Sequence, residues 1–436
     1  MRAGDDAFPG IIGFGQTVLP HLERAIIAGH DVILLGERGQ GKTRLIRTLT
    51  GLLDEWTPAV AGCEINDHPF APVCARCRRL TAELGDGLPV VWHHRDDRYG
   101  EKLATPDTSV GDLIGDIDPV KVAEGRTLGD PETIHFGLVP RTNRGIFCLN
   151  ELPDLAERIQ VALLNVLEER DIGVRGYALR LPLDLVLVAS ANPEDYTNRG
   201  RIITPLKDRF GAEIRTHYPA SLESELALIR QESRVAWDGQ DPGSLLPAHL
   251  VEVIARFTRL VRASPAVDAR SGVSARFAIA AAEAVAASAV RRAAISGEAQ
   301  PVARVCDLPA IVSTLRGKVE FEVSEEGREQ EVLDHLLRRA IAETFRASLG
   351  NADMGGLLAR FTDGGSVESG DLVPAGDLLR RVGDVPGLAK IMERLSMDGS
   401  ESFGQAAAAL EFALEGLYLM RRLAKDVVDG GAVYRT

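Results

Sequence analysis

The stretch Asp31–Leu45, DVILLGERGQGKTRL, decides the fold, because an apolar run of strand type leads through a glycine-rich loop into a helical pattern. The loop GERGQGKT fits the P-loop pattern G-x-x-x-x-G-K-[ST] in the strand–loop–helix setting that this pattern requires. Backbone N–H groups of such a loop turn inward around phosphate oxygens, and the start of the following helix favours negative charge. The predicted nucleotide-binding residues are Gly36, Glu37, Arg38, Gly39, Gln40, Gly41, Lys42 and Thr43.

Two side chains of this loop have distinct expected roles. Lys42 is expected to contact the terminal phosphates as a point charge, and the Thr43 hydroxyl is expected to bind Mg²⁺. The alternative is a chance glycine-rich turn, and the strand before the loop and the helix after it count against that alternative. ATP and Mg²⁺ are therefore the predicted cofactors.

The overall composition sets limits on the kind of protein. A chain of 436 residues is expected to form two or three packed units. No apolar run reaches the roughly 18 to 20 residues of a membrane span, and the amino terminus lacks a signal-peptide pattern, so a cytoplasmic location is predicted. The net charge of −13 argues against broad, nonspecific binding of nucleic acid, which depends on Lys and Arg at phosphates.

Residues 1–220 alternate short apolar runs with helical stretches, which predicts an α/β domain around a largely parallel sheet. Arg95–Arg144 is too long for a simple connection between two strands, and it is expected to be an insertion with its own structure. The expected strands are Asp31–Leu35, Pro89–His94, Gly145–Asn150, Leu183–Ser190 and Ala212–Tyr218.

The pattern becomes helical after Pro219. Ser221 fits a helix N-cap, and Ala275–Ile295 has high helix propensity, so residues 221–350 are predicted to form an all-helical lid. Residues 351–436 are predicted to hold a Gly- and Asp-rich linker and a helical C-terminal extension, whose last helical segment runs from about Asp377 to Val428.

A second acidic position is expected at the end of a strand beside the P-loop. Glu151 follows the apolar strand that ends at Asn150, and it is expected to polarise the attacking water as general base. The alternative is a solvated carboxylate before a helix, because Asp154 and Glu157 already form a capping box. Asn150 stands where such a site normally has Asp, so its hold on Mg²⁺-bound water is weaker by roughly one to two kcal/mol. Slow turnover is a consequence that this residue allows.

Two further residues follow later strands. Asn192 ends the strand before the Asn-Pro dipeptide, and its amide could orient the attacking water; a simple Asn-Pro turn is the alternative. Arg209 precedes the last strand, where a guanidinium could reach the nucleotide of a neighbouring subunit as an arginine finger. An ordinary surface pair with Asp208 is the alternative for Arg209.

Three of the five cysteines lie within fifteen residues of one another. The pattern Cys63-x4-His68-x5-Cys74-x2-Cys77 has ligand types and a C-x2-C spacing that are compatible with structural Zn²⁺. The alternative is a set of reduced loop thiols, since no second C-x2-C pair exists.

The order of these motifs resembles the AAA+ superfamily, and several stretches are similar to the ATPase subunit of magnesium chelatase and to MoxR proteins. The similarity covers roughly 280 residues, from Ile11 to about Val290, and leaves the last 90 or so residues without a counterpart. The stretches are FPGIIGFGQTVLPHLERAII, GERGQGKTRL, GDLIGDIDPVKVAEGRTLGDPETIHFGLVPRTNRGIFCLNE, SANPEDY and LKDRFG.

The resemblance implies roles for residues that have no special meaning by themselves. Arg276, at the start of the Ala-rich helix, would be the sensor-2 arginine that contacts the nucleotide from the lid. Asp118–Leu138 would correspond to the helix-2 insert of this branch, and Asp171–Leu181 to the hairpin before the sensor strand. Arg175 and Tyr177 of that hairpin would contact the pore or a partner.

The resemblance also implies partners. Family members assemble as hexameric rings with ATP between subunits, and many act on a protein with a von Willebrand factor A domain; a finger supplied in trans requires head-to-tail contact. A motor that remodels a protein partner is the first hypothesis. The alternatives are the magnesium chelatase subunit that drives metal insertion into a porphyrin, a nucleic-acid motor, and a nucleotide switch with little turnover.

Overall fold

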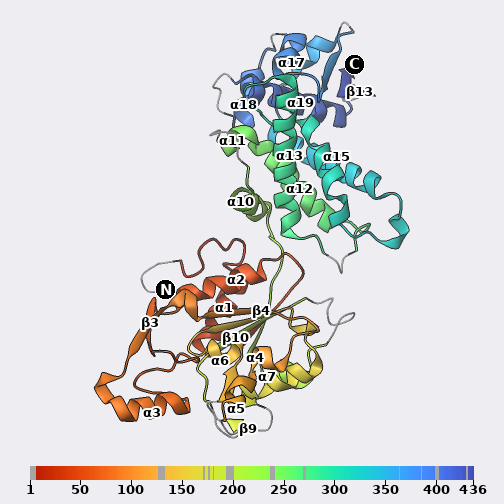
Figure 1. Cartoon of the computed structure of the whole chain (residues 1–436). Helices are drawn as coiled ribbons and strands as arrows, with labels where there is room; N and C mark the ends of the chain where they lie inside the picture. The colour runs from red at the N-terminus through yellow and green to blue at the C-terminus, as the bar shows by residue number, and fades with distance from the viewer. Residues whose placement is uncertain are drawn as a thin grey trace. The chain divides into compact units, whose positions relative to one another are not determined.

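The computed structural model divides the chain into two compact units, unit 1 up to Tyr218 and unit 2 from Pro219 onward (Figure 1). None of the helices in the described part of the chain combines the length and apolar character that a membrane crossing needs. The described residues are 6–125, 133–169, 172–174, 177–179, 181–192, 201–235, 241–268, 272–362, 364–383, 385–397, 402–428 and 431–436.

Unit 1 contains a five-stranded sheet with the order β11-β1-β10-β7-β4, in which every neighbouring pair is parallel. The central strands are continuous apolar runs because both of their faces are covered. This sheet confirms the predicted α/β fold class. Its strands are β1 (Val32–Leu35), β4 (Tyr99–Leu103), β7 (Ile146–Asn150), β10 (Val186–Ala191) and β11 (Ala212–Arg215).

Alternate side chains of each strand enter two separate apolar clusters. Val32 and Leu34 pack on the face that α1 and α2 cover, whereas Ile33 and Leu35 pack on the face toward α7 and α9. Helices thus cover both faces of the sheet. Because all five strands are parallel, their carboxyl ends lie at one edge of the sheet, which is where ligands bind in folds of this type. The covering helices are α1 (Val18–Ile27), α2 (Lys42–Thr48), α7 (Glu157–Glu169) and α9 (Thr204–Arg209).

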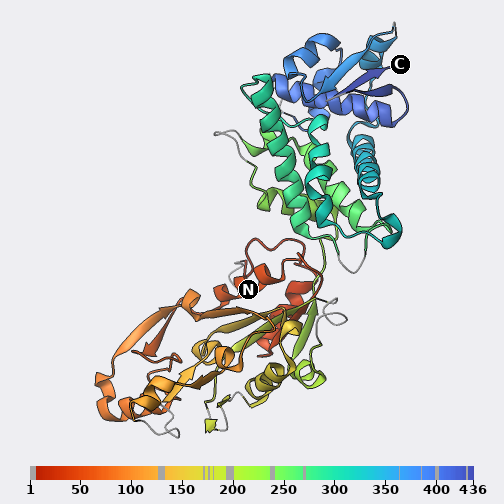
Figure 2. The ribbon, with the colours of Figure 1, turned by 45° about the vertical axis from the view of Figure 1, so that its right-hand side comes forward.

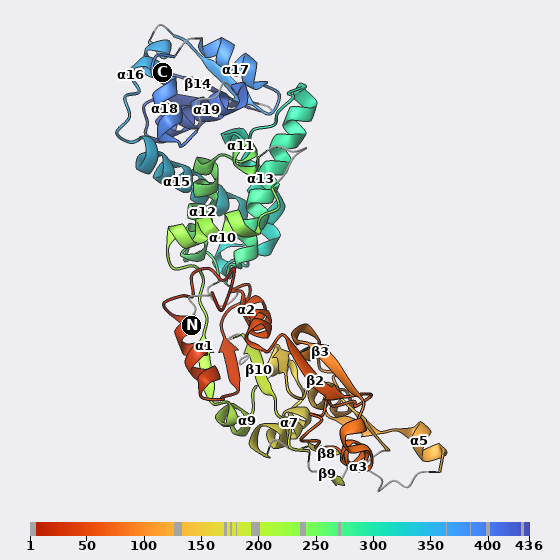
Figure 3. The same ribbon diagram turned by 90° about the vertical axis from the view of Figure 1, so that its left-hand side faces the viewer.

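The predicted place of one strand is wrong. The run at Pro89–His94 forms β3 (Val90–His94), which pairs antiparallel with β2 (Trp56–Val60) in a separate two-stranded sheet (Figure 3). The edge strand of the main sheet is instead β4, which lies inside the segment predicted as an insertion. An edge strand buries less apolar surface, so the polar sequence YGEKL carried a weaker signal than VVWHH, whose first three side chains are exposed.

The remainder of the predicted insertion has its own small elements. Strands β5 and β6 pair antiparallel, and Gly137 beside them approaches the backbone of Leu113 so closely that a Cβ would lie 2.5 Å from its carbonyl carbon. Strands β8 and β9 form the expected hairpin, while Arg175 lies outside the described residues. The elements of the insertion are α4 (Val110–Leu113), β5 (Gly115–Ile117), α5 (Pro119–Ala123), β6 (Ile134–Phe136) and α6 (Leu138–Arg141), whereas β8 (Ile172–Val174) and β9 (Tyr177–Leu179) come after it in the chain.

Unit 2 is mainly helical and has one continuous apolar core, which runs across position 350, where the sequence predicted a boundary. Helix α19 lies at its centre, and Gly416 makes room for the ring of Phe345. The main helices are α10 (Leu222–Glu232), α12 (Ala248–Arg262), α13 (Ala275–Ser296), α14 (Pro309–Leu315), α15 (Glu329–Leu349), α17 (Ala375–Val382), α18 (Leu388–Arg394) and α19 (Phe403–Leu419).

The C-terminal extension is helical, as predicted, but it also contains a three-stranded antiparallel sheet that the sequence did not predict (Figure 2). The predicted helical segment is wrong at its end, because Ala424–Val428 forms β13. That strand pairs with β14 (Gly431–Arg435), which in turn pairs with β12 (Val367–Gly370). Strand β12 lies far from β14 in sequence, and local helix propensity gives no sign of such a partner, whereas only two residues separate β13 from β14.

Candidate nucleotide site

The P-loop connects β1 to α2 at the carboxyl edge of the main sheet. Two of its glycines are required by geometry: Gly41 has φ of 82°, and a Cβ on Gly36 would lie 2.0 Å from the Thr216 hydroxyl oxygen. Two residues that follow β11 hold the loop in place. The Thr216 hydroxyl donates to Gln40 Oε1 at 2.7 Å, and the Tyr218 hydroxyl donates to the Arg38 carbonyl at 2.9 Å. The loop therefore has the compact backbone that a phosphate site needs.

Lys42 lies inside this loop and is only 7% exposed. Its ammonium donates to the carbonyl oxygens of Gly36 and Glu37 and, at 2.7 Å, to Asn192 Oδ1. Thr43 follows it at the start of α2 and is half-buried. The two residues predicted to contact phosphate and Mg²⁺ are thus adjacent at the beginning of a helix, where negative charge is stabilised.

Asn192 joins the P-loop to the end of the next strand. Its side-chain N–H donates to Glu151 Oε2 at 2.5 Å, while its oxygen accepts from Lys42. Glu151 itself has a left-handed backbone, with φ of 56°, directly after β7. Such a conformation is uncommon for a residue with a side chain and occurs often at functional sites. The structure thus brings together three of the predicted site residues, Lys42, Glu151 and Asn192.

Asn150 lies beside a carboxylate that the sequence analysis missed. Its Nδ2 donates to Glu101 Oε1 at 2.7 Å, and its Oδ1 accepts from the Ser190 hydroxyl at 3.1 Å. Glu101 is on β4, the edge strand that was assigned to an insertion. The signal that could have revealed Glu101 is the alternation of side chains between the two faces in YGEKL, the sequence of β4. This strand pairs with β7, which ends at Asn150.

The Glu101 carboxylate is stabilised in its charged form. Burial alone would raise its pKa, but hydrogen bonds from Arg47 at 2.9 Å and Tyr99 at 3.0 Å outweigh burial and lower the pKa of Glu101 below its ordinary value. A negative oxygen therefore lies next to Asn150. Hydroxyl, amide and carboxylate oxygens are the ligand types that Mg²⁺ prefers, directly or through water, so the side chains of Thr43, Asn150 and Glu101 fit a magnesium nucleotide.

The other predicted residues lie apart from this group. Arg209, on α9, forms surface pairs with Glu168 at 2.9 Å and Asp208 at 3.3 Å, and its side chain is 38% exposed. Arg276 is exposed near the start of α13 in unit 2, where its backbone N–H donates to Ser274 Oγ. Both guanidinium groups are thus accessible on their own units.

The structure brings together three of the four residues that the sequence analysis named as possible zinc ligands. Cys63, Cys74 and Cys77 lie together, but the group is completed by Asp67, and His68 is not a member. The His68 ring instead turns toward Phe70, whose backbone N–H donates to Nδ1 at 3.1 Å. Successive side chains in an extended segment point in opposite directions, so only one of two neighbours can face the thiols.

Several known proteins are similar to this chain in sequence. Residues 126–209 match the model of the Sigma-54 interaction domain family. The chain is 30% identical over 243 residues to the magnesium-chelatase 38 kDa subunit of Rhodobacter capsulatus, which covers 55% of this chain and 63% of that protein. It is also 30% identical over 269 residues to the magnesium-chelatase subunit ChlI of Synechocystis sp., covering 59% of this chain and 68% of that protein.

Among solved structures, one likeness is to a model of the complex between BchI and BchD of magnesium chelatase, at 22% identity and a TM-score of 0.37. It covers 75% of this chain and 98% of that chain. The family assignment rests on the sequence matches. The chain spans less than two thirds of the length of the first of these relatives.

Proposed function

Because this chain belongs to the family of AAA+ ATPase subunits of the magnesium-chelatase type, we propose that it hydrolyses ATP and uses the energy to remodel a protein partner. The observation that carries the proposal is the line of hydrogen bonds from Lys42 through Asn192 to Glu151. This line connects Lys42, which is predicted to contact the terminal phosphates, with Glu151, which is predicted to act as general base.

The proposed division of labour follows from these positions. Bound ATP and Mg²⁺ supply the leaving group and neutralise its charge. The P-loop and Lys42 would bind the phosphates, and Thr43 and Asn150 would hold the metal with the negative charge of Glu101 nearby. Glu151 accepts a proton from the attacking water, and Asn192 fixes the direction of the Glu151 carboxylate. Arg276 is proposed to contact the nucleotide from unit 2.

We further propose that the chain assembles as a head-to-tail ring, a hexamer, in which Arg209 of each subunit reaches the nucleotide of its neighbour. An exposed guanidinium on the helix before β11 supports this role, since a trans-acting arginine must be accessible. A cytoplasmic partner with a von Willebrand factor A domain remains the proposed client. The proposed domains are 1–220, 221–350 and 351–436.

Two other functions are supported by particular observations. Family membership supports a magnesium chelatase subunit that drives metal insertion into a porphyrin. Asn150 in place of Asp supports a nucleotide switch with little turnover. The switch differs from the motor in one measurable respect, because it binds ATP tightly and releases it unchanged.

The deciding experiment is Mg²⁺-dependent ATP hydrolysis at several protein concentrations, with wild type, Glu151→Gln and Arg209→Ala. We expect specific activity to rise with concentration and to fall at least 100-fold in Glu151→Gln with ATP binding retained, as loss of a general base costs about 10²–10⁴-fold. Arg215→Ala, an exposed arginine on β11, is the matched control for Arg209→Ala. Tight binding without turnover in the wild type would replace the motor with the switch.

A further inference from the structure

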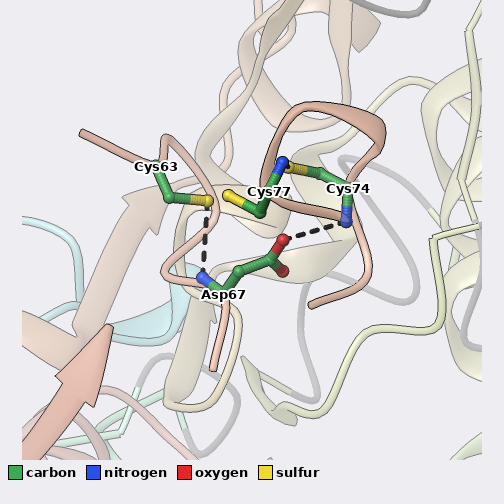
Figure 4. Close-up of side chains that lie close together, drawn as sticks. All are labelled: Cys63, Asp67, Cys74 and Cys77. Atoms are coloured by element: carbon green, nitrogen blue, oxygen red, sulfur yellow. Dashed lines mark hydrogen bonds between the residues drawn. The ribbon is translucent and has the colours of Figure 1, made fainter. Parts of the chain in front are cut away.

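A second cluster of reactive side chains lies away from the nucleotide site, in the segment that joins β2 to α3 (Ala75–Leu84). It consists of Cys63, Asp67, Cys74 and Cys77, here called the Cys₃Asp cluster, and Figure 4 shows these side chains converging. One ligand atom from each residue lies within 4.8 Å of all the others. All three cysteines are free thiols.

The spacing fits one small metal ion. Zn²⁺ binds Cys sulfur at about 2.3 Å in a tetrahedron, which places two ligand sulfurs about 3.8 Å apart. Atoms that already lie within 4.8 Å of one another reach this geometry through small rotations of the side chains. An iron–sulfur cluster distributes its cysteine ligands over several iron atoms and needs a wider opening. The cluster therefore favours a mononuclear tetrahedral ion.

The backbone around the cluster is arranged to stabilise negative sulfur. Cys74 is the N-cap of α3, and the N–H of Cys77 donates to its Sγ at 3.3 Å. The N–H of Asp67 donates to the Sγ of Cys63 at 3.4 Å. Hydrogen bonds of this kind orient metal ligands and reduce the repulsion among thiolates.

Asp67 supplies an independent observation. The residue is 1% exposed, and its Oδ2 accepts from the N–H of Cys74 at 2.9 Å. Its Oδ1 is buried without a hydrogen-bond partner among the described residues. Buried carboxylate oxygens nearly always accept a hydrogen bond. An oxygen without such a bond beside three thiols therefore indicates a position for a bound metal ion.

Helix α3 lacks the apolar contacts that normally attach a helix to a protein. Of its ten residues, all of them described, only Cys77 is buried. The loop before α3 is firmly placed by comparison, since Ile65 is fully buried in the core of unit 1 and accepts from Asn143 Nδ2 at 3.0 Å. A metal ion between Cys63 and Cys77 would therefore attach a polar helix to an ordered loop, as in small domains that lack a sufficient core.

We propose that the Cys₃Asp cluster binds one structural Zn²⁺ ion, which holds α3 against the loop that follows β2. The competing explanation for Cys74-x2-Cys77 at a helix start is a redox-active dithiol. A dithiol needs neither a third thiol nor a buried carboxylate, and both are present here. The proposal is independent of ATP hydrolysis, because its first readout is metal content.

The test is metal analysis of the purified full-length chain by mass spectrometry. We expect one zinc per chain in the wild type and less than a tenth of that in Cys63→Ser and Cys77→Ser. His68→Ala is the matched control, because His68 adjoins Asp67 but faces Phe70; it should keep its zinc. Equal zinc loss in His68→Ala, or a wild-type chain that is free of metal and takes up no added Zn²⁺, would overturn the proposal.

A second measurement covers variants that fail to fold. Wild-type chain stripped with a chelator and titrated with Co²⁺ alone should show the visible bands of tetrahedral thiolate-bound cobalt at one equivalent, and one equivalent of Zn²⁺ should abolish them. Hydrogen exchange of α3 should slow at the same equivalence point, with exchange in β1 and β10 unchanged. A reversible Cys74–Cys77 disulfide with no cobalt spectrum would establish the dithiol instead.

Discussion

Buried charge is arranged in opposite ways in the two units. In unit 2, Arg304 and Glu411 pair at 3.5 Å while 0% and 2% exposed, and Arg292 pairs with Asp307 at 3.2 Å. Both pairs are enclosed by helices of one apolar core. In unit 1, the buried Lys42 lies at the open edge of a parallel sheet. A charge enclosed in a core therefore supports the structure, whereas a charge at the ends of parallel strands is placed for a ligand.

Removal of one partner from a buried ion pair of unit 2 should lower the unfolding free energy more than any other change proposed below. Arg304→Met leaves Glu411 buried without its partner and also removes donors from the carbonyls of Gly370 and Val373. We expect unit 2 to lose about 3–5 kcal/mol of unfolding free energy. Chemical denaturation of the full chain, with hydrogen exchange of α19 as the local readout, measures it. The double variant Arg304→Met/Glu411→Leu should recover part of the loss, and no recovery would mean that the pair does not act as a unit.

The same kind of change in unit 1 should have the opposite outcome. Lys42→Ala removes a buried ammonium that we propose contacts phosphate, so ATP affinity should fall about 100-fold, or roughly 2–3 kcal/mol, while unfolding free energy stays within about 1 kcal/mol of wild type. Titration with a fluorescent ATP analogue and urea denaturation give the two numbers. Lys121→Ala, on α5, is the control. If Lys42→Ala unfolded the unit, the contrast between the two units would fail.

Unit 2 also contains a buried neutral base. His249 is 3% exposed, packs against Phe412 with ring centroids 4.7 Å apart, and burial lowers its pKa to about 3. Because the unfolded chain binds a proton near pH 6.5, stability should fall as pH drops from 6.5 toward 3 and stay level above 7. At pH 5 the expected loss from this group is about 2 kcal/mol. His249→Leu should flatten the pH profile of α19 protection, and the exposed His335→Leu should leave it unchanged.

The sequence predicted those parts of the molecule in which the residues that act together are also close together in the sequence. GERGQGKT after DVILL defined the P-loop because all its determinants are adjacent, and the strand ends at Glu151 and Asn192 followed from the rule that parallel strands end together. Glu101 and Asp67 were missed for the same physical reason. Each residue has a functional role only through partners that folding brings close. The partner of Glu101 is Asn150 on the neighbouring strand, and the partners of Asp67 are the thiols of three cysteines. The pairing of β12 with β14 was missed because the two strands lie far apart in sequence, whereas a local hairpin signal, the Asp-Gly dipeptide between β13 and β14, was overlooked.

The smallest expected effect concerns the carboxylate beside Asn150. If Glu101 supplies the charge that an Asp at position 150 would otherwise provide, Glu101→Gln should raise the Mg²⁺ concentration for half-maximal ATPase activity about tenfold, near 1.4 kcal/mol. Asn150→Asp alone should bring no gain, because two carboxylates at this distance repel each other and one takes up a proton.

The double variant Glu101→Gln/Asn150→Asp separates this idea from simple loss of structure. It keeps one carboxylate and one amide but exchanges their places, so Mg²⁺ dependence should return toward wild type. Arg47→Gln removes another hydrogen-bond partner of Glu101 but leaves the Glu101 carboxylate in place. Its Mg²⁺ dependence shows how much the hydrogen bonds around Glu101 contribute apart from the Glu101 charge. A double variant no better than Glu101→Gln would assign Glu101 to the structure of the β4 edge. The contrast between charge enclosed in a core and charge at the sheet edge would then rest on Lys42 alone.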